Sequence, residues 1–288
     1  MSGAVLVFGQ TGQLAQELAR LAGVRCLGRA EADLSDPEAC AEAVRRAAPR
    51  AVINAAAFTA VDRAEAEEAL AQRINAEAPG AMAAACGAAG IPFVQVSSDY
   101  VFDGAGSAPW AVDAATGPLG AYGRTKLAGE AAVRAAGGVH AIVRTSWVFS
   151  AQGSNFLRTM LRFGAERAEV SVVADQIGGP TPADALAEAC LTIADRLVID
   201  PAKSGTYHFA GTPDTSWAGF AREIFTQAGL ACSVREIATT DYPTPARRPA
   251  NSRLDCTASE AAFGLKRPDW RAGVARALTK IKAGEARQ

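Results

Sequence analysis

The stretch AVLVFGQTGQLA, residues 4–15, decides the fold class of this chain. Its apolar first half predicts a buried strand, and its second half begins a helix that we expect over 13–22. Between them Gly9 permits a tight turn, Gly12 lets a pyrophosphate approach the backbone, and Ala15 is small enough for the helix to pack closely on the strand. This arrangement predicts a dinucleotide at the start of the helix, where free N–H groups attract phosphate. The loop residues expected to contact it are Gly9, Thr11, Gly12, Gln13 and Leu14.

Short apolar runs alternate with Ala-rich stretches throughout the first half of the chain. The expected strands are 4–8, 24–27, 51–53, 91–96 and 141–144, and the expected helices include 13–22, 66–75, 78–89 and 121–136. Near-continuous apolar strands that alternate with helices predict an α/β fold built on a Rossmann-type doubly wound parallel sheet.

The alternation loosens after residue 148, which predicts two units. We expect residues 1–148 to form an NAD(P)-binding Rossmann domain whose core extends into parts of the later chain. Residues 149–288 are expected to form mainly a smaller C-terminal α/β lobe that binds the substrate. Within that lobe, three prolines in residues 243–249 exclude a helix or a central strand and predict an extended loop.

Composition excludes several other classes of protein. The 288 residues are 49% hydrophobic, and 29 basic residues nearly balance 30 acidic ones, for a net charge of −1. Such a chain is too apolar to be disordered and too neutral to be a basic nucleic-acid binder. No apolar run reaches the roughly 18–20 residues that span a bilayer, and the N-terminus shows no signal peptide. We therefore expect a cytoplasmic protein without a membrane partner.

The cysteines and histidines do not form a metal-binding pattern. The six cysteines are scattered without Cys-x-x-Cys spacing, and His140 and His208 lie far apart in the sequence. We predict reduced cysteines, no disulfide framework and no metal site. The scarcity of histidine also means that proton transfer has to use other side chains.

Tyr122 and Lys126 are candidates for that chemistry. Their spacing of four residues places both on one face of a helix. A nearby ammonium stabilises a phenolate, so we expect Lys126 to lower the pKa of Tyr122. Ser98 follows the strand expected over 91–96, at the sheet edge where open α/β sheets bind their ligands. Its hydroxyl is expected to hydrogen-bond a substrate carbonyl that Tyr122 protonates.

Arg29 bears on which nicotinamide cofactor the chain uses. It follows the second expected strand, where many dinucleotide-binding proteins carry an acid that binds the adenosine ribose. An arginine there suits the 2′-phosphate of NADPH instead. Glu31 and Asp33 lie close behind and could bind the ribose of NADH, so NADH also fits. Because of Arg29, NADPH is favoured.

Several longer motifs resemble one family. They are FGQTGQL (8–14), NAAAFTAVD (54–62), SDYVFDG (98–104), YGRTKLAGE (122–130), RTSWVF (144–149), Asp175-Gln176 with Pro180-Thr181, and YPTPARRPANSRL (242–254). In this order they resemble the extended short-chain dehydrogenase/reductase superfamily and, more closely, the dTDP-4-dehydrorhamnose reductase family within it. The resemblance implies reduction of the C4 keto group of dTDP-4-dehydro-L-rhamnose to dTDP-L-rhamnose by NAD(P)H, a step towards polysaccharide sugars.

The resemblance also assigns roles by position. It makes Tyr122 the proton donor, Lys126 a contact of the nicotinamide ribose, and Ser98, where the family usually has Thr, the partner of the carbonyl. The cofactor contacts that it implies are Gly12, Gln13, Leu14, Asp33, Leu34, Ala56, Ala57 and Thr59. The substrate contacts that it implies are Ser98, Asp99 and Trp147.

Three further residues each keep two interpretations. Arg248 in the proline-rich loop suits a nucleotide diphosphate through bidentate contacts, or is a solvated charge beside Arg247. Asn155 binds substrate, or caps the helix that starts at Phe156. Glu17 is by resemblance a candidate ligand for Mg²⁺ at a dimer interface, or an exposed helix charge. No metal site is predicted at Glu17.

Two other functions remain as alternatives to the reductase. One is a related nucleotide-sugar epimerase or reductase, and the other is a non-catalytic regulatory subunit that binds the cofactor. Ser98, Tyr122 and Lys126 argue against the regulatory subunit. Asp62 and Glu65 are interpreted as local charges at a helix start and not as catalytic carboxylates. The sequence is compatible with a monomer or a homodimer.

Overall fold

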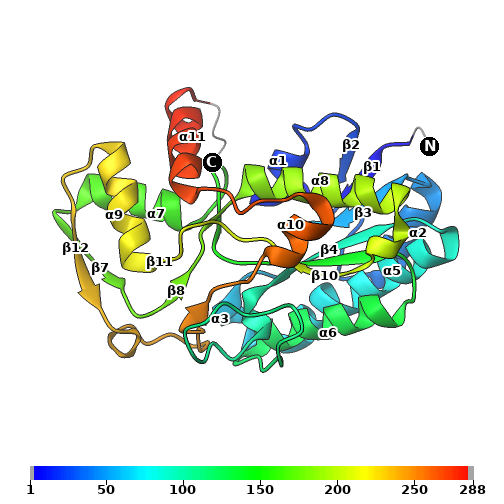
Figure 1. The fold of residues 1–288 in the computed structure, drawn as a ribbon, viewed down its shortest axis with the longest axis horizontal. Helices are drawn as coiled ribbons and strands as arrows, with labels where there is room; N and C mark the ends of the chain where they lie inside the picture. The colour runs from blue at the N-terminus through cyan, green and yellow to red at the C-terminus, as the bar shows by residue number, and fades with distance from the viewer. Residues whose placement is uncertain (1–2, 285–288) are drawn as a thin grey trace.

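The computed structural model describes residues 3–284 and has a six-stranded parallel sheet at its centre (Figure 1). In spatial order the strands are β10 (Gly205–His208), β5 (His140–Thr145), β4 (Phe93–Ser98), β3 (Ala51–Asn54), β1 (Val5–Phe8) and β2 (Val24–Leu27). Every neighbouring pair is parallel. β1 and β3 are buried at every position, which explains their continuous apolar sequence.

Helices cover both faces of this sheet (Figure 1). One face carries α2 (Pro37–Ala47), α5 (Ala78–Ala89) and α6 (Ala121–Ala135), and the other carries α1 (Gln13–Leu18) and α8 (Ala183–Ile199). The predicted doubly wound Rossmann-type sheet is therefore confirmed. β10 and α8 come from the later part of the chain, yet they complete this sheet and its apolar core.

A smaller α/β unit lies beside the sheet (Figure 1). Its helices are α7 (Phe156–Glu166), α9 (Trp217–Ala228) and α11 (Trp270–Lys282), and its longest strands are the parallel pair β7 (Glu169–Val173) and β12 (Ser233–Ile237). Its remaining elements are β6 (Val148–Phe149), β8 (Ile177–Gly178), β9 (Thr181–Pro182), β11 (Thr215–Ser216) and β13 (Asn251–Ser252). The short helix α10 (Thr257–Phe263) instead packs against the apolar core of the central sheet. As predicted, the proline-rich segment 243–249 contains neither helix nor strand.

Two expected helices differ from the structure. The helix expected over 13–22 ends at Leu18, because the chain has to turn at Gly23, whose φ is +75°, to enter β2. The helix expected over 66–75 is divided into α4 (Glu68–Gln72) and a π-helix, η1 (Arg73–Glu77), and a separate short helix, α3 (Val61–Ala64), precedes it. Apolar periodicity does not reveal such interruptions, because they arise from contacts with distant segments.

The thiols and the hydropathy agree with the sequence analysis. All six cysteines are free, and five of them are buried. Within residues 3–284 no helix combines the length and the apolar character that crossing a membrane requires.

Candidate functional site

Four parallel strands bring the candidate site residues to one edge of the sheet. β1, β3, β4 and β5 end there, so the loops that follow them lie together. Strand order reverses between β1 and β3, because the chain moves to β2 on one side and to β4 on the other. Open α/β sheets bind their ligands at such a reversal, outside the carboxyl ends of the strands.

The loop between β1 and α1 has the backbone geometry that a phosphate site needs. Gly9 has a φ of +121°, which is strained for any residue with a side chain. Ala15 is 1% exposed, and its Cβ would lie 3.2 Å from a Cβ at Gly9, so a small residue suffices for close packing. A Cβ at Gly12 would meet no described atom within 4 Å. The glycine at 12 is therefore not required by packing within the chain, and the open space in front of its backbone fits a ligand.

Gln13 provides a second observation at this loop. Its amide nitrogen donates a 3.4 Å hydrogen bond to the carbonyl of Val148, which joins the loop to the segment after β5. Its amide oxygen is buried without a hydrogen-bond partner in the described part of the chain. Since buried polar atoms are almost always paired, this oxygen fits a ligand that brings a donor. Together with Gly12, it makes the loop suitable for a dinucleotide.

Sequence reasoning missed Asn75, which holds the loop after β3. The Asn75 side chain accepts a 2.8 Å hydrogen bond from Phe58 N and donates to Phe58 O at 3.2 Å and to the Thr125 hydroxyl at 3.1 Å. The loop carries Ala56, Ala57 and Thr59, which are partly or fully exposed as cofactor contacts would have to be. Asn75 lies in the π-helix η1, a distortion that is frequent at functional sites. This distortion is visible only in the structure, so no sequence pattern indicated the role of Asn75.

Ser98, Asp99 and Tyr122 come together where β4 ends. The Ser98 hydroxyl donates a 2.9 Å hydrogen bond to Asp99 Oδ1, and the Ser98 side chain lies close enough to Tyr122 to lower the pKa of its phenol. The Tyr122 ring packs edge-on against Tyr100, with 5.4 Å between ring centroids. Helix α6 can come this close to Tyr100 because residue 123 is a glycine. A side chain there would overlap the Tyr100 carbonyl. The structure thus assembles the predicted Ser–Tyr pair.

The expected lowering of the Tyr122 pKa is wrong. Burial raises the pKa of Tyr122 to about 12, the nearby Asp99 carboxylate adds to this, and the Ser98 side chain only partly opposes it. Lys126 does not contribute, since its ammonium donates a 2.7 Å hydrogen bond to the carbonyl of Val96. Tyr122 is therefore a phenol at neutral pH, the form that a proton donor needs.

Lys126 and Asp99 are themselves perturbed by burial. Lys126 is 3% exposed, and burial lowers its pKa to about 8 against the attraction of Glu130. Burial raises the pKa of Asp99 to about 6, against hydrogen bonds from Ser252 and Ser98. Perturbed groups that cluster at a sheet edge mark a functional site.

A buried ion pair supports α6 from behind. Glu130, fully buried one turn after Lys126, accepts hydrogen bonds from Arg144 at 2.8 and 2.7 Å and from the Ser97 hydroxyl at 2.6 Å. Although burial alone raises the pKa of Glu130, its interactions with Arg144 hold it below the ordinary value. His208 lies beside Arg144 and stays neutral, because burial lowers its pKa to about 4.

Trp147 forms an aromatic platform with Trp217, a residue that sequence reasoning missed. The two rings stack with centroids 3.7 Å apart and planes within 14°. Trp147 has a φ of +49°, and Trp217 is fixed by a 3.2 Å hydrogen bond from its indole nitrogen to Gln176. The two tryptophans lie far apart in the sequence, so no local pattern pairs them.

The remaining predicted residues fall at the periphery of this edge. Arg29 is exposed and lies 3.8 Å from Asp33, and Leu34 beside them is buried. Asn155 caps α7: its Oδ1 accepts from Arg158 N at 3.1 Å, and its Nδ2 donates to the carbonyls of Ser150 and Gln152. The capping interpretation of Asn155 is thus confirmed.

Arg248 is not a solvated charge. Its guanidinium forms a bidentate pair with Asp62, at 3.1 and 2.9 Å, and also donates to the Ala246 carbonyl at 3.2 Å. Hydrogen bonds from Arg248 hold the pKa of Asp62 below its ordinary value. Asp62 therefore ties the proline-rich loop to α3.

Comparison with known proteins places the chain in a family. The family model described as "RmlD substrate binding domain" matches residues 3–283. A dTDP-4-dehydrorhamnose reductase of Burkholderia thailandensis is 47% identical over 286 residues, covering 94% of this chain and 96% of the relative. The chain belongs to the dTDP-4-dehydrorhamnose reductase family. A reductase of the same name from Escherichia coli K12 is 42% identical over 96% of this chain and 97% of its own length.

Solved structures agree with membership of this reductase family. A dTDP-4-dehydrorhamnose reductase from Bacillus anthracis, in complex with NADP, superposes with a TM-score of 0.90 at 33% identity. The alignment covers 97% of this chain and all of that one. The family is one of oxidoreductases, as the sequence motifs indicated.

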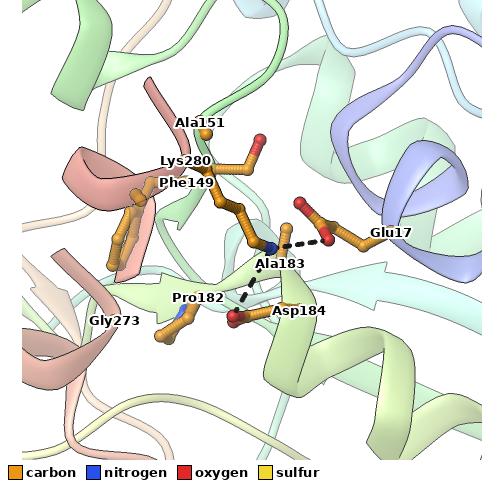
Figure 2. A pocket seen from close by; sticks show the side chains of 10 residues that line it. Glu17, Phe149, Ala151, Pro182, Ala183, Asp184, Gly273 and Lys280 are labelled. Atoms are coloured by element: carbon orange, nitrogen blue, oxygen red, sulfur yellow. Dashed lines mark hydrogen bonds and ion pairs between the residues drawn. The ribbon is translucent and has the colours of Figure 1, made fainter. Parts of the chain in front are cut away.

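Of the two interpretations of Glu17, the exposed charge is wrong and the metal ligand is not supported. The Glu17 side chain is 4% exposed, so it is not an exposed helix charge. Lys280, from α11, places its ammonium 3.0 Å from Glu17 and 3.9 Å from Asp184 of α8 (Figure 2). Residues 3–284 also contain no group of three or more metal-ligating side chains. A divalent cation does not fit where a lysine already neutralises the carboxylate, so Mg²⁺ binding by Glu17 is not supported.

Replacement of Lys280 by methionine is expected to lower the free energy of unfolding by about 1–3 kcal/mol. The change leaves a buried carboxylate without its charged hydrogen-bond donor. Urea unfolding measures the loss, and the double variant Glu17→Gln/Lys280→Met should recover part of it. EDTA should leave the Tm of the wild-type protein unchanged. A fall in the Tm on addition of EDTA would show that a bound metal stabilises the protein.

Proposed function

We propose that this chain catalyses the NADPH-dependent reduction of the C4 keto group of dTDP-4-dehydro-L-rhamnose, giving dTDP-L-rhamnose. Relatives that carry the reductase name at 42–47% identity over nearly the whole chain support the reaction. The observation that carries the proposal is the convergence of Ser98, Tyr122 and Lys126 at the edge of the sheet beside the open phosphate loop.

The cofactor would lie along the strand-order reversal. Residues Gly9, Thr11, Gly12, Gln13 and Leu14 would hold its pyrophosphate, Arg29, Asp33 and Leu34 its adenosine end, and Ala56, Ala57 and Thr59 its middle. The Bacillus anthracis structure in complex with NADP supports this choice of cofactor. When bound, NADPH supplies the hydride. In this proposal residues 1–148 bind the cofactor, with β10 and α8 completing their sheet, and residues 149–288 mainly bind the substrate.

Tyr122 acts as the proton donor in this proposal. When substrate binds, the Ser98 hydroxyl would turn from Asp99 Oδ1 to the substrate carbonyl and orient it, and the Tyr122 phenol would deliver its proton to the same oxygen as negative charge develops there. A pKa of about 12 keeps Tyr122 protonated before the reaction. Lys126 would hold the nicotinamide ribose beside Tyr122. Because two donors face one oxygen, orientation supplies much of the rate enhancement.

The substrate would extend from this carbonyl towards the smaller lobe. Asp99 and Trp147 are proposed to contact the sugar, with Trp217 holding the Trp147 ring in place. Arg248 is proposed to bind the diphosphate. Asn155 contributes through the helix it caps, because its hydrogen-bonding groups already have partners within the chain.

Turnover by the purified protein tests the proposal. Wild-type protein should consume NADPH when dTDP-4-dehydro-L-rhamnose is added, with dTDP-L-rhamnose as the product. An epimerase would instead retain its nicotinamide cofactor and consume no net NADPH. A regulatory subunit would bind NADPH, show no turnover and copurify with a larger enzyme. Either of these results would reject the reductase.

Replacement of Arg29 by alanine is expected to raise the Kd for NADPH about tenfold while the Kd for NADH changes little. A charge-assisted contact with a 2′-phosphate contributes about 1.4 kcal/mol or more, and only NADPH carries that phosphate. Titrations that follow the nicotinamide fluorescence measure both constants. An equal change in the two constants would show that Arg29 does not read the 2′-phosphate.

A further inference from the structure

Asp62 has its partner outside its own helix. Its carboxylate accepts two hydrogen bonds from the Arg248 guanidinium and a third from the backbone N–H of Ala246. The paired side chains are 40% and 26% exposed. Their charges act on Tyr100, the ring that packs against Tyr122, so the pair lies near the candidate site. The pair uses one edge of the guanidinium, because the Arg248 contacts described within the chain come from Nη1 and Nη2. The Nε edge remains available for a phosphate oxygen.

Glu65, three residues later, has its partner at the start of the helix that carries Tyr122. Helix α6 begins at Ala121, and its N-cap residue, Gly120, has no side chain to accept a hydrogen bond. Glu65 accepts the Ala121 N–H at 2.8 Å instead. A side chain at Gly120 would overlap this carboxylate oxygen, so the glycine leaves room for the contact. A carboxylate at a helix N-terminus satisfies a free amide and stabilises the helix dipole.

Both carboxylates therefore belong to one short helical segment, and each forms a contact with a different part of the candidate site. Asp62 and Glu65 are three apart, so they lie close together on the surface of α3 (Val61–Ala64) and the residue after it. One reaches the loop of the smaller lobe that contains Arg248, and the other reaches the first turn of α6. Neither contact depends on a ligand.

We propose that Asp62 and Glu65 are positioning residues, with Asp62 aligning Arg248 for the nucleotide diphosphate and Glu65 aligning the first turn of α6 for proton donation by Tyr122. This inference rests on the proposed function. The two residues should have different kinetic effects, because Asp62 would affect substrate binding and Glu65 would affect proton transfer from Tyr122. A long side chain that is ordered before binding loses less entropy when the ligand arrives. A donor in a firmly held helical turn keeps its alignment with the carbonyl.

Variants of Asp62 test the first half. In Asp62→Ala and Asp62→Asn, the KM for the dTDP-linked keto sugar and the Kd for dTDP should rise about 3- to 10-fold, the factor expected for immobilising one such side chain on binding. The kcat and the Kd for NADPH should stay close to wild type. Because Asp62 acts through Arg248, the double variant with Arg248→Ala should bind dTDP no more weakly than Arg248→Ala alone.

Variants around Glu65 test the second half. Glu65→Ala should lower kcat about fivefold, which corresponds to the loss of a typical helix cap, and leave the KM unchanged. Glu65→Gln should restore most of the activity, since its amide oxygen accepts the same hydrogen bond. Gly120→Ala should reproduce the loss because the new methyl group displaces the carboxylate, and Gly120→Ala should add nothing to Glu65→Ala.

Glu67→Gln is the matched control. Glu67 is a carboxylate in the same segment, and it pairs with Arg63 on the surface. It should leave kcat, KM and the Kd for dTDP unchanged. The proposal is overturned if Asp62→Ala leaves the KM and the dTDP affinity unaltered, or if Asp62→Ala and Glu65→Ala change kcat and KM alike.

Two readouts do not need turnover, so they separate this inference from the reductase activity. They are the Kd for dTDP by calorimetry and hydrogen exchange of the Ala121 amide, which should be faster in Glu65→Ala and unchanged in Glu67→Gln. If the wild-type protein fails to reduce the keto sugar, the proposed function is wrong. The two positioning contacts are then supported or overturned by these two measurements alone.

Discussion

Tyr122→Phe is expected to lower kcat by about 10²–10⁴-fold, the contribution of a positioned general acid. The change removes one hydroxyl and keeps the ring that packs edge-on against Tyr100, so the fold and the affinity for NADPH should be retained. Steady-state NADPH consumption with dTDP-4-dehydro-L-rhamnose measures the loss, and a fluorescence titration measures cofactor binding.

Tyr207→Phe provides the control for this variant. The Tyr207 hydroxyl donates a 2.7 Å hydrogen bond to the Lys203 carbonyl, and Tyr207 lies in β10, outside the cluster of Ser98, Tyr122 and Lys126. Its kcat should match that of the wild-type protein. A Tyr122→Phe variant that keeps more than about a tenth of the wild-type kcat would show that another group delivers the proton.

Glu130→Gln is expected to lower the free energy of unfolding by about 3–5 kcal/mol, because it leaves the buried Arg144 charge without its partner. Arg144 is 3% exposed, so water cannot replace the lost carboxylate. Urea unfolding followed by circular dichroism measures the change, and the Tm should fall by roughly 10 °C.

The double variant Glu130→Leu/Arg144→Met separates charge from packing. If the loss arises from an unpaired buried charge, this variant should be more stable than Glu130→Gln, since apolar replacements of a buried ion pair are often neutral. Glu67→Gln, at an exposed pair, should change stability by less than about 1 kcal/mol. A loss of less than about 1 kcal/mol in Glu130→Gln would contradict the role assigned to the Glu130–Arg144 pair.

The sequence predicted those parts of the site that follow from local order and strand direction. The phosphate loop was predictable because its glycines and small residue are neighbours in the chain, between a strand and a helix. Ser98 and Tyr122 were predictable as a pair because one ends a parallel strand and the other starts the next long helix. Parallel strands end at one edge, so a correct element order suffices to bring such residues together.

The sequence did not predict the electrostatics of these residues. Spacing placed Lys126 on the face of α6 that carries Tyr122 and suggested a lowered tyrosine pKa. The direction is the opposite, because burial and Asp99 dominate and the lysine ammonium bonds the Val96 carbonyl. Desolvation depends on everything packed around a group, which spacing along one helix does not contain.

The sequence by itself thus determined the sheet, the glycine-containing loop proposed to bind the cofactor, and the tyrosine proposed to donate the proton. Only the tertiary structure decided which remote groups support these elements. The contacts are the ion pairs of Arg248 with Asp62 and of Lys280 with Glu17, the hydrogen bond from the Ala121 N–H to Glu65, and the stack of Trp147 on Trp217. The partners of the Arg248 and Lys280 pairs are 186 and 263 residues apart in the chain. Periodicity and capping signals reach only a few residues, whereas these contacts form when packing of the apolar core brings remote segments together.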